Sequence, residues 1–186
     1  MKHTLVALVE NKPGVLVRVA GMFRRRNFNI ESLTVGHTET SELSCMTIVV
    51  DGAHTDIEQV ERNLGKLVNV VGLTDLTHKP AVVRDLALVK VHADGSGRAE
   101  LMQLASIFNA KIVDVAHDAI IIEIVATEQK VDSLVDLCRP FGIIEMVRTG
   151  RVAMARGSSS NGRVDGVVRA WSSSTESAER EEFDQE

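Results

Sequence analysis

The stretch VENKPGVLVRVAGMF, from Val9 to Phe23, joins an apolar strand to an amphipathic helix. The helix is predicted by apolar residues that recur at three- and four-residue intervals, namely Val15, Leu16, Val19, Met22 and Phe23. The apolar run that ends at Glu10 predicts a strand from about Thr4 that is buried on both faces. A Pro-Gly pair between them, Pro13 and Gly14, predicts a turn that opens the helix. The chain therefore begins with a strand, a turn and a helix.

The elements that follow continue this order as βαββαβ. We expect a hairpin over 29–37 and 43–51, a helix with an apolar stripe from Ile57 to Leu67, and a strand over 69–77. Thr55 is the expected helix N-cap and Glu58 its capping-box acid. After Pro80 the order repeats, with strands expected at 84–93, 111–116, 119–127 and 142–148 and helices at 98–108 and about 131–138. The chain is thus an internal repeat of roughly 80 residues per unit.

This repeat predicts an α+β protein with two tandem ferredoxin-like βαββαβ domains, each an antiparallel sheet with both helices on one face. We expect domains at 1–78 and 84–157, a linker at 79–83 and a tail at 158–186. A unit of this size buries little surface alone, and its first strand is apolar on both sides. We therefore expect sheets to associate, between the halves or between chains, with dimerisation as the default.

The composition argues against several classes of function. The 186 residues carry a net charge of -5 and include one Trp and no Tyr, which argues against a nucleic-acid partner. The apolar run before Glu10 is too short for a signal peptide or a membrane span, so we expect no membrane association and a cytoplasmic location. The two cysteines, Cys45 and Cys138, are interpreted as reduced, buried thiols. The six histidines show no metal-ligand spacing and no catalytic constellation appears, so we expect neither a metal site nor catalytic residues.

The turn before the first helix is the best candidate for a binding site. A helix N-terminus has unpaired backbone amides and partial positive charge, which suit a carboxylate or phosphate. Gly14 permits close approach to the main chain, and the Asn11 amide can both donate and accept. An ordinary strand-to-helix turn with Asn and Gly cap residues explains the same spacing. The matching loop of the second unit, residues 94–98, contains a Gly-x-Gly that is a weak nucleotide signal and is more simply a turn.

The residues after Gly157 differ in composition from the rest of the chain. They are rich in Ser, Gly and Glu and hold seven acidic residues against three Arg. This composition predicts a disordered tail. A docking patch of Val164, Val167, Val168 and Trp171 is the alternative to a solvated extension.

Several segments together resemble the small, regulatory subunits of acetolactate synthase (acetohydroxyacid synthase), which begin with an amino-acid-sensing ACT domain. The resemblance rests on ENKPGVLVRVAGMF, NFNIESLTV, LSCMTIVV and LGKLVNVVGL in the first unit and on RDLALVKV and EMVRTGRVAMARG in the second. It spans about Leu5 to Gly157. The chain departs from the family pattern at Asn27, where Gly is usual, and at Cys45, where Arg is common. The acidic tail lies outside the pattern.

The resemblance implies a non-catalytic partner of the large catalytic subunit, an enzyme expected to carry thiamine diphosphate, Mg and FAD, while this chain carries no cofactor. It implies a homodimer through the ACT domains that activates the large subunit and confers feedback inhibition by valine in branched-chain amino-acid synthesis. The effector site falls at Asn11, Gly14, Val15 and Leu16 of one chain, with Asn29 and Ile30 contributed across the dimer interface. Leucine or isoleucine as a weaker effector stays open, because an apolar pocket discriminates weakly between them.

Two other functions remain as alternatives. One is a free-standing ACT-type sensor that acts on a transcriptional or transport partner, and the other is a small ACT-associated enzyme. Co-purification of a thiamine-dependent large subunit would distinguish the resemblance from the first alternative. The absence of a recognisable catalytic pattern argues against the second.

Overall fold

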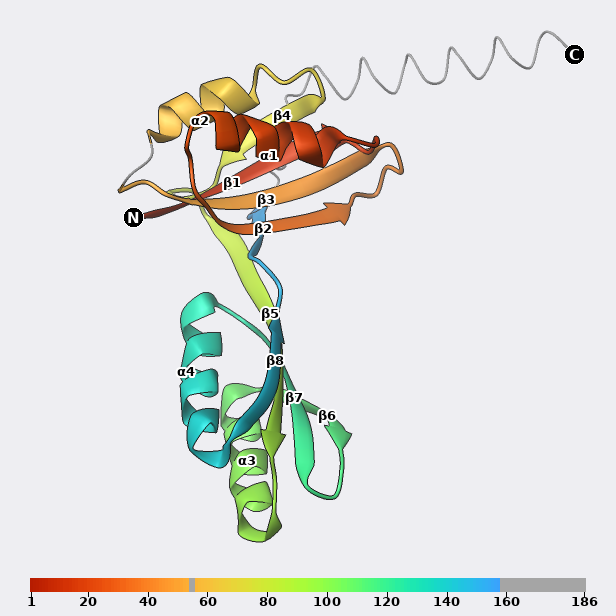
Figure 1. Ribbon diagram of the computed structural model, residues 1–186, viewed down its shortest axis with the longest axis vertical. Helices are drawn as coiled ribbons and strands as arrows, with labels where there is room; N and C mark the ends of the chain where they lie inside the picture. Colours follow the sequence, from red (N-terminus) through yellow and green to blue (C-terminus); the bar gives the residue numbers. More distant parts are fainter. Residues whose placement is uncertain (54–55, 158–186) are drawn as a thin grey trace, which may run out of the picture. The chain divides into compact units, whose positions relative to one another are not determined.

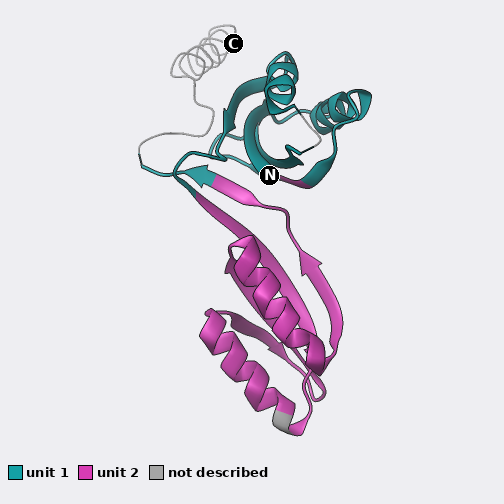
Figure 2. Ribbon diagram, turned by 90° about the vertical axis from the view of Figure 1, so that its left-hand side faces the viewer, with its two compact units in different colours: residues 1–31, 35–81, 154–186 teal, residues 32–34, 82–153 magenta. Residues whose placement is uncertain are grey.

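The computed structural model describes residues 1–53 and 56–157, with the exception of the Ser96 side chain. The chain forms two compact units (Figure 2). Of the described residues, the first unit comprises 1–31, 35–53, 56–81 and 154–157, and the second comprises 82–153 and 32–34. The predicted disorder of the tail concerns residues that lie outside the described part.

The elements follow one another in the order seen in Figure 1. Those of the first unit are β1 (Lys2–Glu10), α1 (Val15–Arg25), β2 (Ile30–His37), β3 (Leu43–Asp51), α2 (Ile57–Leu64) and β4 (Val70–Asp75). Those that follow are β5 (Ala81–His92), α3 (Gly95–Phe108), β6 (Lys111–Val115), β7 (Ala119–Ala126), α4 (Glu128–Cys138), the 3-10 helix η1 (Arg139–Phe141), β8 (Ile143–Arg148) and β9 (Val152–Ala155).

The first unit is a four-stranded sheet in the order β2-β3-β1-β4, in which β1 pairs antiparallel with both β3 and β4. Both helices lie on the same face of this sheet (Figure 1). Leu5, Val6 and Ala7 are consecutive in β1, so their side chains alternate between the faces, and all three are buried. The predicted burial of the first strand on both sides is therefore confirmed.

Left-handed residues delimit α1 at both ends. Gly14 precedes the helix with φ 85°. At the other end Asn27 has φ 56°, its amide donates to the Arg24 carbonyl, and the Phe28 amide donates to the Phe23 carbonyl. These two bonds and the edge-to-face contact of the Phe23 and Phe28 rings form a Schellman motif. Asn27 thus supplies the left-handed turn that ends α1.

The N-cap of α2 differs from the prediction. The helix begins at Ile57, and the Asp56 side chain accepts a hydrogen bond from the Gln59 amide at 3.2 Å. The capping residue is therefore Asp56, one position after the expected Thr55, which lies outside the described residues. Glu58 accordingly falls one position before the third helical residue, which is Gln59. An aspartate carboxylate caps a helix as well as a threonine hydroxyl does, so local sequence did not distinguish the two.

The second unit repeats the arrangement. Its sheet has the order β6-β7-β5-β8, and β9 also pairs with β5. Both helices lie on one face, and the core between them and the sheet is made of aliphatic residues, among them Val89, Ile122, Leu101 and Leu134. The two sheets and their helices confirm the predicted pair of ferredoxin-like domains.

Two boundaries depart from expectation. β5 begins at Ala81, inside the segment 79–83 that was expected to be a linker. β9 was not predicted, since the last expected strand ended at Arg148. The strand is short, and its place is set by its pairing with β5, about 70 residues earlier in the chain, which a local pattern does not reveal.

Cys45 and Cys138 are both free thiols. Burial raises the pKa of Cys138 to about 11 and also raises that of Cys45, so both are neutral thiols near pH 7. In the part of the chain that the structure describes, no helix combines the length and the hydropathy needed to cross a bilayer.

Candidate functional site

The turn between β1 and α1 leaves backbone donors unpaired. The Val15 amide donates to the Lys12 carbonyl at 3.3 Å, and the Arg18 amide donates to the Gly14 carbonyl at 3.0 Å. Among the described residues, the amides of Gly14, Leu16 and Val17 have no hydrogen-bond partner. No side chain caps this end of α1 and its first turn holds no acidic residue, so the partial positive charge of the helix end is not offset there.

Gly14 leaves space at this turn. A Cβ atom placed on it meets no atom within 4 Å, so the residue is not glycine to avoid a clash. Its φ of 85° is the reason, because side chains disfavour that backbone conformation. The space beside the unpaired amides is therefore open to a small anionic group.

Asn11 is held in place by the loop between β2 and β3. Its backbone amide donates to the Glu42 carbonyl at 2.6 Å, and its side-chain Nδ2 donates to the Ser41 carbonyl at 2.8 Å. The side-chain oxygen keeps its capacity to accept. The sequence indicated Asn11 as a donor and an acceptor, and the structure shows that one donor hydrogen is already used. Ser41 and Glu42 were not predicted, because they contact Asn11 across 30 residues of chain.

The charged side chains next to the turn are hydrogen-bonded within the fold. The hydrogen bond from Asn69 and, after it, the Lys12 ammonium at 3.2 Å hold the pKa of Glu10 below its usual value. Arg18 donates to the Asn69 side-chain oxygen at 2.9 Å. Because Lys12 is engaged with Glu10, the backbone amides are the main donors that the turn offers to a ligand. Asn69 has no local signal in the sequence and was not predicted.

The apolar members of the predicted site divide between the core and the surface. Val15 is 4% exposed and belongs to the core, whereas Leu16 is 44% exposed beside the unpaired amides. Leu16 is therefore free to contact an aliphatic ligand, and Val15 serves to fix the first turn of α1.

Asn29 and Ile30 lie at the other end of α1 from Gly14 within one chain. They follow the helix C-terminus, and an 11-residue helix is about 16 Å long. Ile30 opens β2, which is an edge strand of the first sheet, and Asn29 donates to Glu31 at 3.1 Å. A single chain thus carries the six predicted site residues in two separate groups, Asn11 to Leu16 and Asn29 to Ile30.

The matching loop of the second unit is filled by its own side chains. The Arg98 guanidinium donates to the carbonyls of Ala93, Ala116 and His117 at 2.7 to 3.1 Å. A Cβ on Gly97 would lie 3.4 Å from the Phe141 ring. These contacts explain the Gly-x-Gly as turn and packing chemistry, as the sequence favoured.

Two models of known protein families match the chain, one in the first unit and one in the second. Residues 5–72 match a model described as the AHAS small subunit-like ACT domain, where AHAS stands for acetohydroxyacid synthase. Residues 84–157 match a model described as the small subunit of acetolactate synthase. Both matches end before the acidic tail.

Individual proteins agree with these models. The chain is 54% identical over 158 residues to a probable acetolactate synthase small subunit of Archaeoglobus fulgidus, covering 85% of this chain and 99% of that one. It is 43% identical over 155 residues to the acetolactate synthase small subunit of Mycobacterium bovis, covering 83% and 92%. The crystal structure of the small subunit from Thermotoga maritima superposes with a TM-score of 0.78 at 42% identity, covering 86% and 99%. The chain therefore belongs to the family of acetolactate synthase small subunits.

Proposed function

We propose that this chain is a regulatory subunit that binds the catalytic large subunit of acetolactate synthase, raises its activity and makes it sensitive to valine. Membership of the small-subunit family supports this role. The observation that carries the effector site is the set of unpaired amides at Gly14, Leu16 and Val17. Thiamine diphosphate, Mg and FAD belong to the large subunit in this proposal, and this chain contributes no catalytic residue.

In the proposed complex the valine carboxylate lies at the N-terminus of α1. It accepts hydrogen bonds from the unpaired amides and is stabilised by the helix dipole. The free oxygen of Asn11 accepts from the valine ammonium, and the isopropyl group contacts Leu16. The carboxylate, the ammonium and the side chain of valine thus each contact a complementary group of the turn.

The site is completed by a second copy of the chain. Asn29 and Ile30 lie too far from Gly14 along α1 to reach the same ligand within one chain. β2 is an edge strand and offers its unpaired edge to a second sheet. We propose that the dimer places Asn29 and Ile30 of one copy over the Gly14 turn of the other.

Valine then acts by differential affinity. It binds one arrangement of the regulatory dimer more tightly than the other and so shifts the large subunit toward its less active state. The size of that shift cannot exceed the difference in binding free energy between the two arrangements.

A negative charge introduced at position 14 tests the proposed carboxylate site. In G14D a carboxylate occupies the place proposed for that of valine, so inhibition of acetolactate formation by the holoenzyme should be lost. Activation of the large subunit by G14D should persist, because nothing lies within 4 Å of the new Cβ. Isothermal titration of the purified chain with valine, leucine and isoleucine measures binding directly, and the purified chain alone should form no acetolactate.

G14N is the matched control, because Asn and Asp tolerate a positive φ comparably and differ here by one charge. The neutral amide should leave the holoenzyme valine-sensitive. Retained inhibition in G14D, or equal loss in G14D and G14N, would contradict a carboxylate site at this turn.

A further inference from the structure

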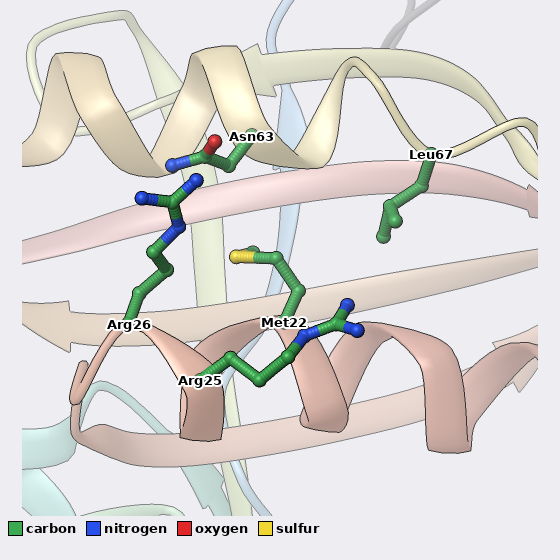
Figure 3. Close-up of a pocket in the computed structure, with 5 residues that line it drawn as sticks. All are labelled: Met22, Arg25, Arg26, Asn63 and Leu67. Atoms are coloured by element: carbon green, nitrogen blue, oxygen red, sulfur yellow. The ribbon is translucent and has the colours of Figure 1, made fainter.

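A basic groove runs between α1 and α2 on the first unit. Two adjoining hollows of about 370 and 680 Å³ share Arg25 and Leu67 among their lining residues. Met22 and Asn63 line the smaller hollow, and Figure 3 shows Met22 projecting into the space between the helices. Val17 and Gly21 contribute to the larger one. The groove thus has apolar side chains along its length.

Four arginines surround this groove, namely Arg18, Arg24, Arg25 and Arg26. Arg18 donates to Asn69, but Arg24, Arg25 and Arg26 are exposed and pair with no carboxylate in the described part of the chain. Figure 3 shows the Arg26 guanidinium pointing toward Asn63 of α2. The described residues that line the two hollows include no acidic side chain. The groove therefore presents unneutralised positive charge next to an apolar surface.

The chain carries a segment of complementary chemistry in residues 176–186, ESAEREEFDQE, which lie outside the described part. Six of these residues are acidic and one, Arg180, is basic. Phe183 stands among Glu181, Glu182 and Asp184, so one aromatic ring is surrounded by carboxylates. A segment of this kind fits a groove with apolar side chains and an arginine rim.

The segment is long enough to reach the groove. The described chain returns to the first unit at its end, where the Arg156 amide donates to the Pro80 carbonyl at 2.9 Å. About 24 residues separate Gly157 from Glu181, and a flexible chain of that length spans about 25–30 Å on average. A unit of about 80 residues has a radius of gyration near 12 Å, so this span matches its diameter.

We propose that residues 176–186 bind in the groove between α1 and α2 of the same chain. The carboxylates pair with Arg24, Arg25 and Arg26, and Phe183 contacts Leu67 and the exposed Val17 side chain. The larger hollow reaches back to Val17 and Arg18, but Arg24, Arg25 and Arg26 lie at the C-terminal end of α1, away from Gly14. The family matches end at residue 157. The interaction is therefore a property of this chain that does not depend on the proposed effector site.

Single-tryptophan fluorescence of the full chain tests the proposal. The chain has one tryptophan, Trp171, so W171F together with F183W moves the only indole into the proposed segment. At low salt this protein should show high anisotropy and low quenching by acrylamide. Adding R24E, R25E and R26E should lower the anisotropy and raise quenching severalfold, as should about 0.5 M salt, which screens the exposed charges.

The control reverses three exposed lysines away from the groove, K2E, K79E and K111E, for the same change in net charge. It should keep the high anisotropy. A tail-side variant, E179Q with E181Q and E182Q, avoids substitutions in the folded unit. Like the arginine variant, it should show low anisotropy and strong quenching by acrylamide. Restoration by E179R, E181R and E182R in the arginine-reversed background would establish direct pairing.

Three outcomes would overturn the proposal. One is an indole that is equally mobile in the parent and in the arginine-reversed protein. Another is an equal loss of anisotropy in the lysine control, which would mean that net charge alone holds the tail. The third is an increase in anisotropy only when the large subunit is added, which would assign the segment to that partner instead of the groove.

Discussion

At the scale of single residues, Asn27 shows how a residue with a side chain can close a helix in the left-handed conformation. The position needs a positive φ to close the Schellman motif after α1, and Asn adopts this conformation at lower cost than other residues with a side chain. The sequence alone permitted this prediction, because the tolerance of Asn is a local property of the backbone.

Substitutions at Asn27 test this account. N27G should leave the free energy of unfolding unchanged or raise it slightly, since Gly adopts the left-handed conformation freely. N27A should lower it by about 1 kcal/mol, because an alanine side chain disfavours φ near 56°. Urea denaturation followed by circular dichroism measures both, and equal stabilities for the two variants would contradict the assignment.

At the scale of elements, one arginine connects three parts of the second unit. Arg148, at the end of β8, donates to Asp85 of β5 at 2.6 and 3.1 Å and to Asp132 of α4 at 2.7 Å. Asp85 is 5% exposed and its Oδ1 has no partner among the described residues, so Arg148 supplies all of its side-chain hydrogen bonds there.

R148M should therefore destabilise the second unit by roughly 2–3 kcal/mol, because it leaves the Asp85 carboxylate buried without its cation. This expected loss of stability is below the usual cost of breaking a buried ion pair, since the Arg148 side chain is 25% exposed. R139M is the matched control, because Arg139 pairs with Asp136 where both side chains are 69% exposed. It should change stability by less than about 0.5 kcal/mol. Adding D85N to R148M should recover much of the loss.

Elements were predicted well where periodicity is local and poorly where pairing is distant. The strand at 43–51 follows from a run of mostly apolar and β-branched residues, and the helix ending at Phe108 follows from a stripe of apolar residues. β9 has only four residues and forms by pairing with β5, which lies far away in the sequence. The N-cap of α2 was a choice between two neighbouring residues, Thr55 and Asp56. Neither contains enough local information to be placed from the sequence.

At the scale of the whole molecule, the proposed effector site is divided between two copies of the chain. The sequence indicated all its residues through family resemblance, and the backbone chemistry of the Gly14 turn was predictable from the Pro-Gly pair. The interactions of Asn11 with Ser41 and Glu42 were not, because they arise only when the β2–β3 loop folds beside β1.

Valine should therefore stabilise the two units unequally. At a hundredfold excess over its dissociation constant, a ligand that binds only the folded state adds about 2.7 kcal/mol. Hydrogen exchange of the full chain should show this added protection in β1 and α1 and little in β7 and α4. Protection should weaken as the protein is diluted below its dimer dissociation constant, and G14D should show none. Uniform protection of both units would contradict a site confined to the first.

The turn at Gly14 offers ligands its main chain more than its side chains. Amide groups are inherited with the fold, whatever substitutions accumulate around them. In the proposed site, recognition of an α-amino acid should accordingly outlast changes in which amino acid is recognised, because the proposed preference resides in exposed aliphatic neighbours such as Leu16. Substitution of one or two aliphatic residues should therefore change which amino acid binds, while the backbone amides proposed to bind its carboxylate stay unchanged.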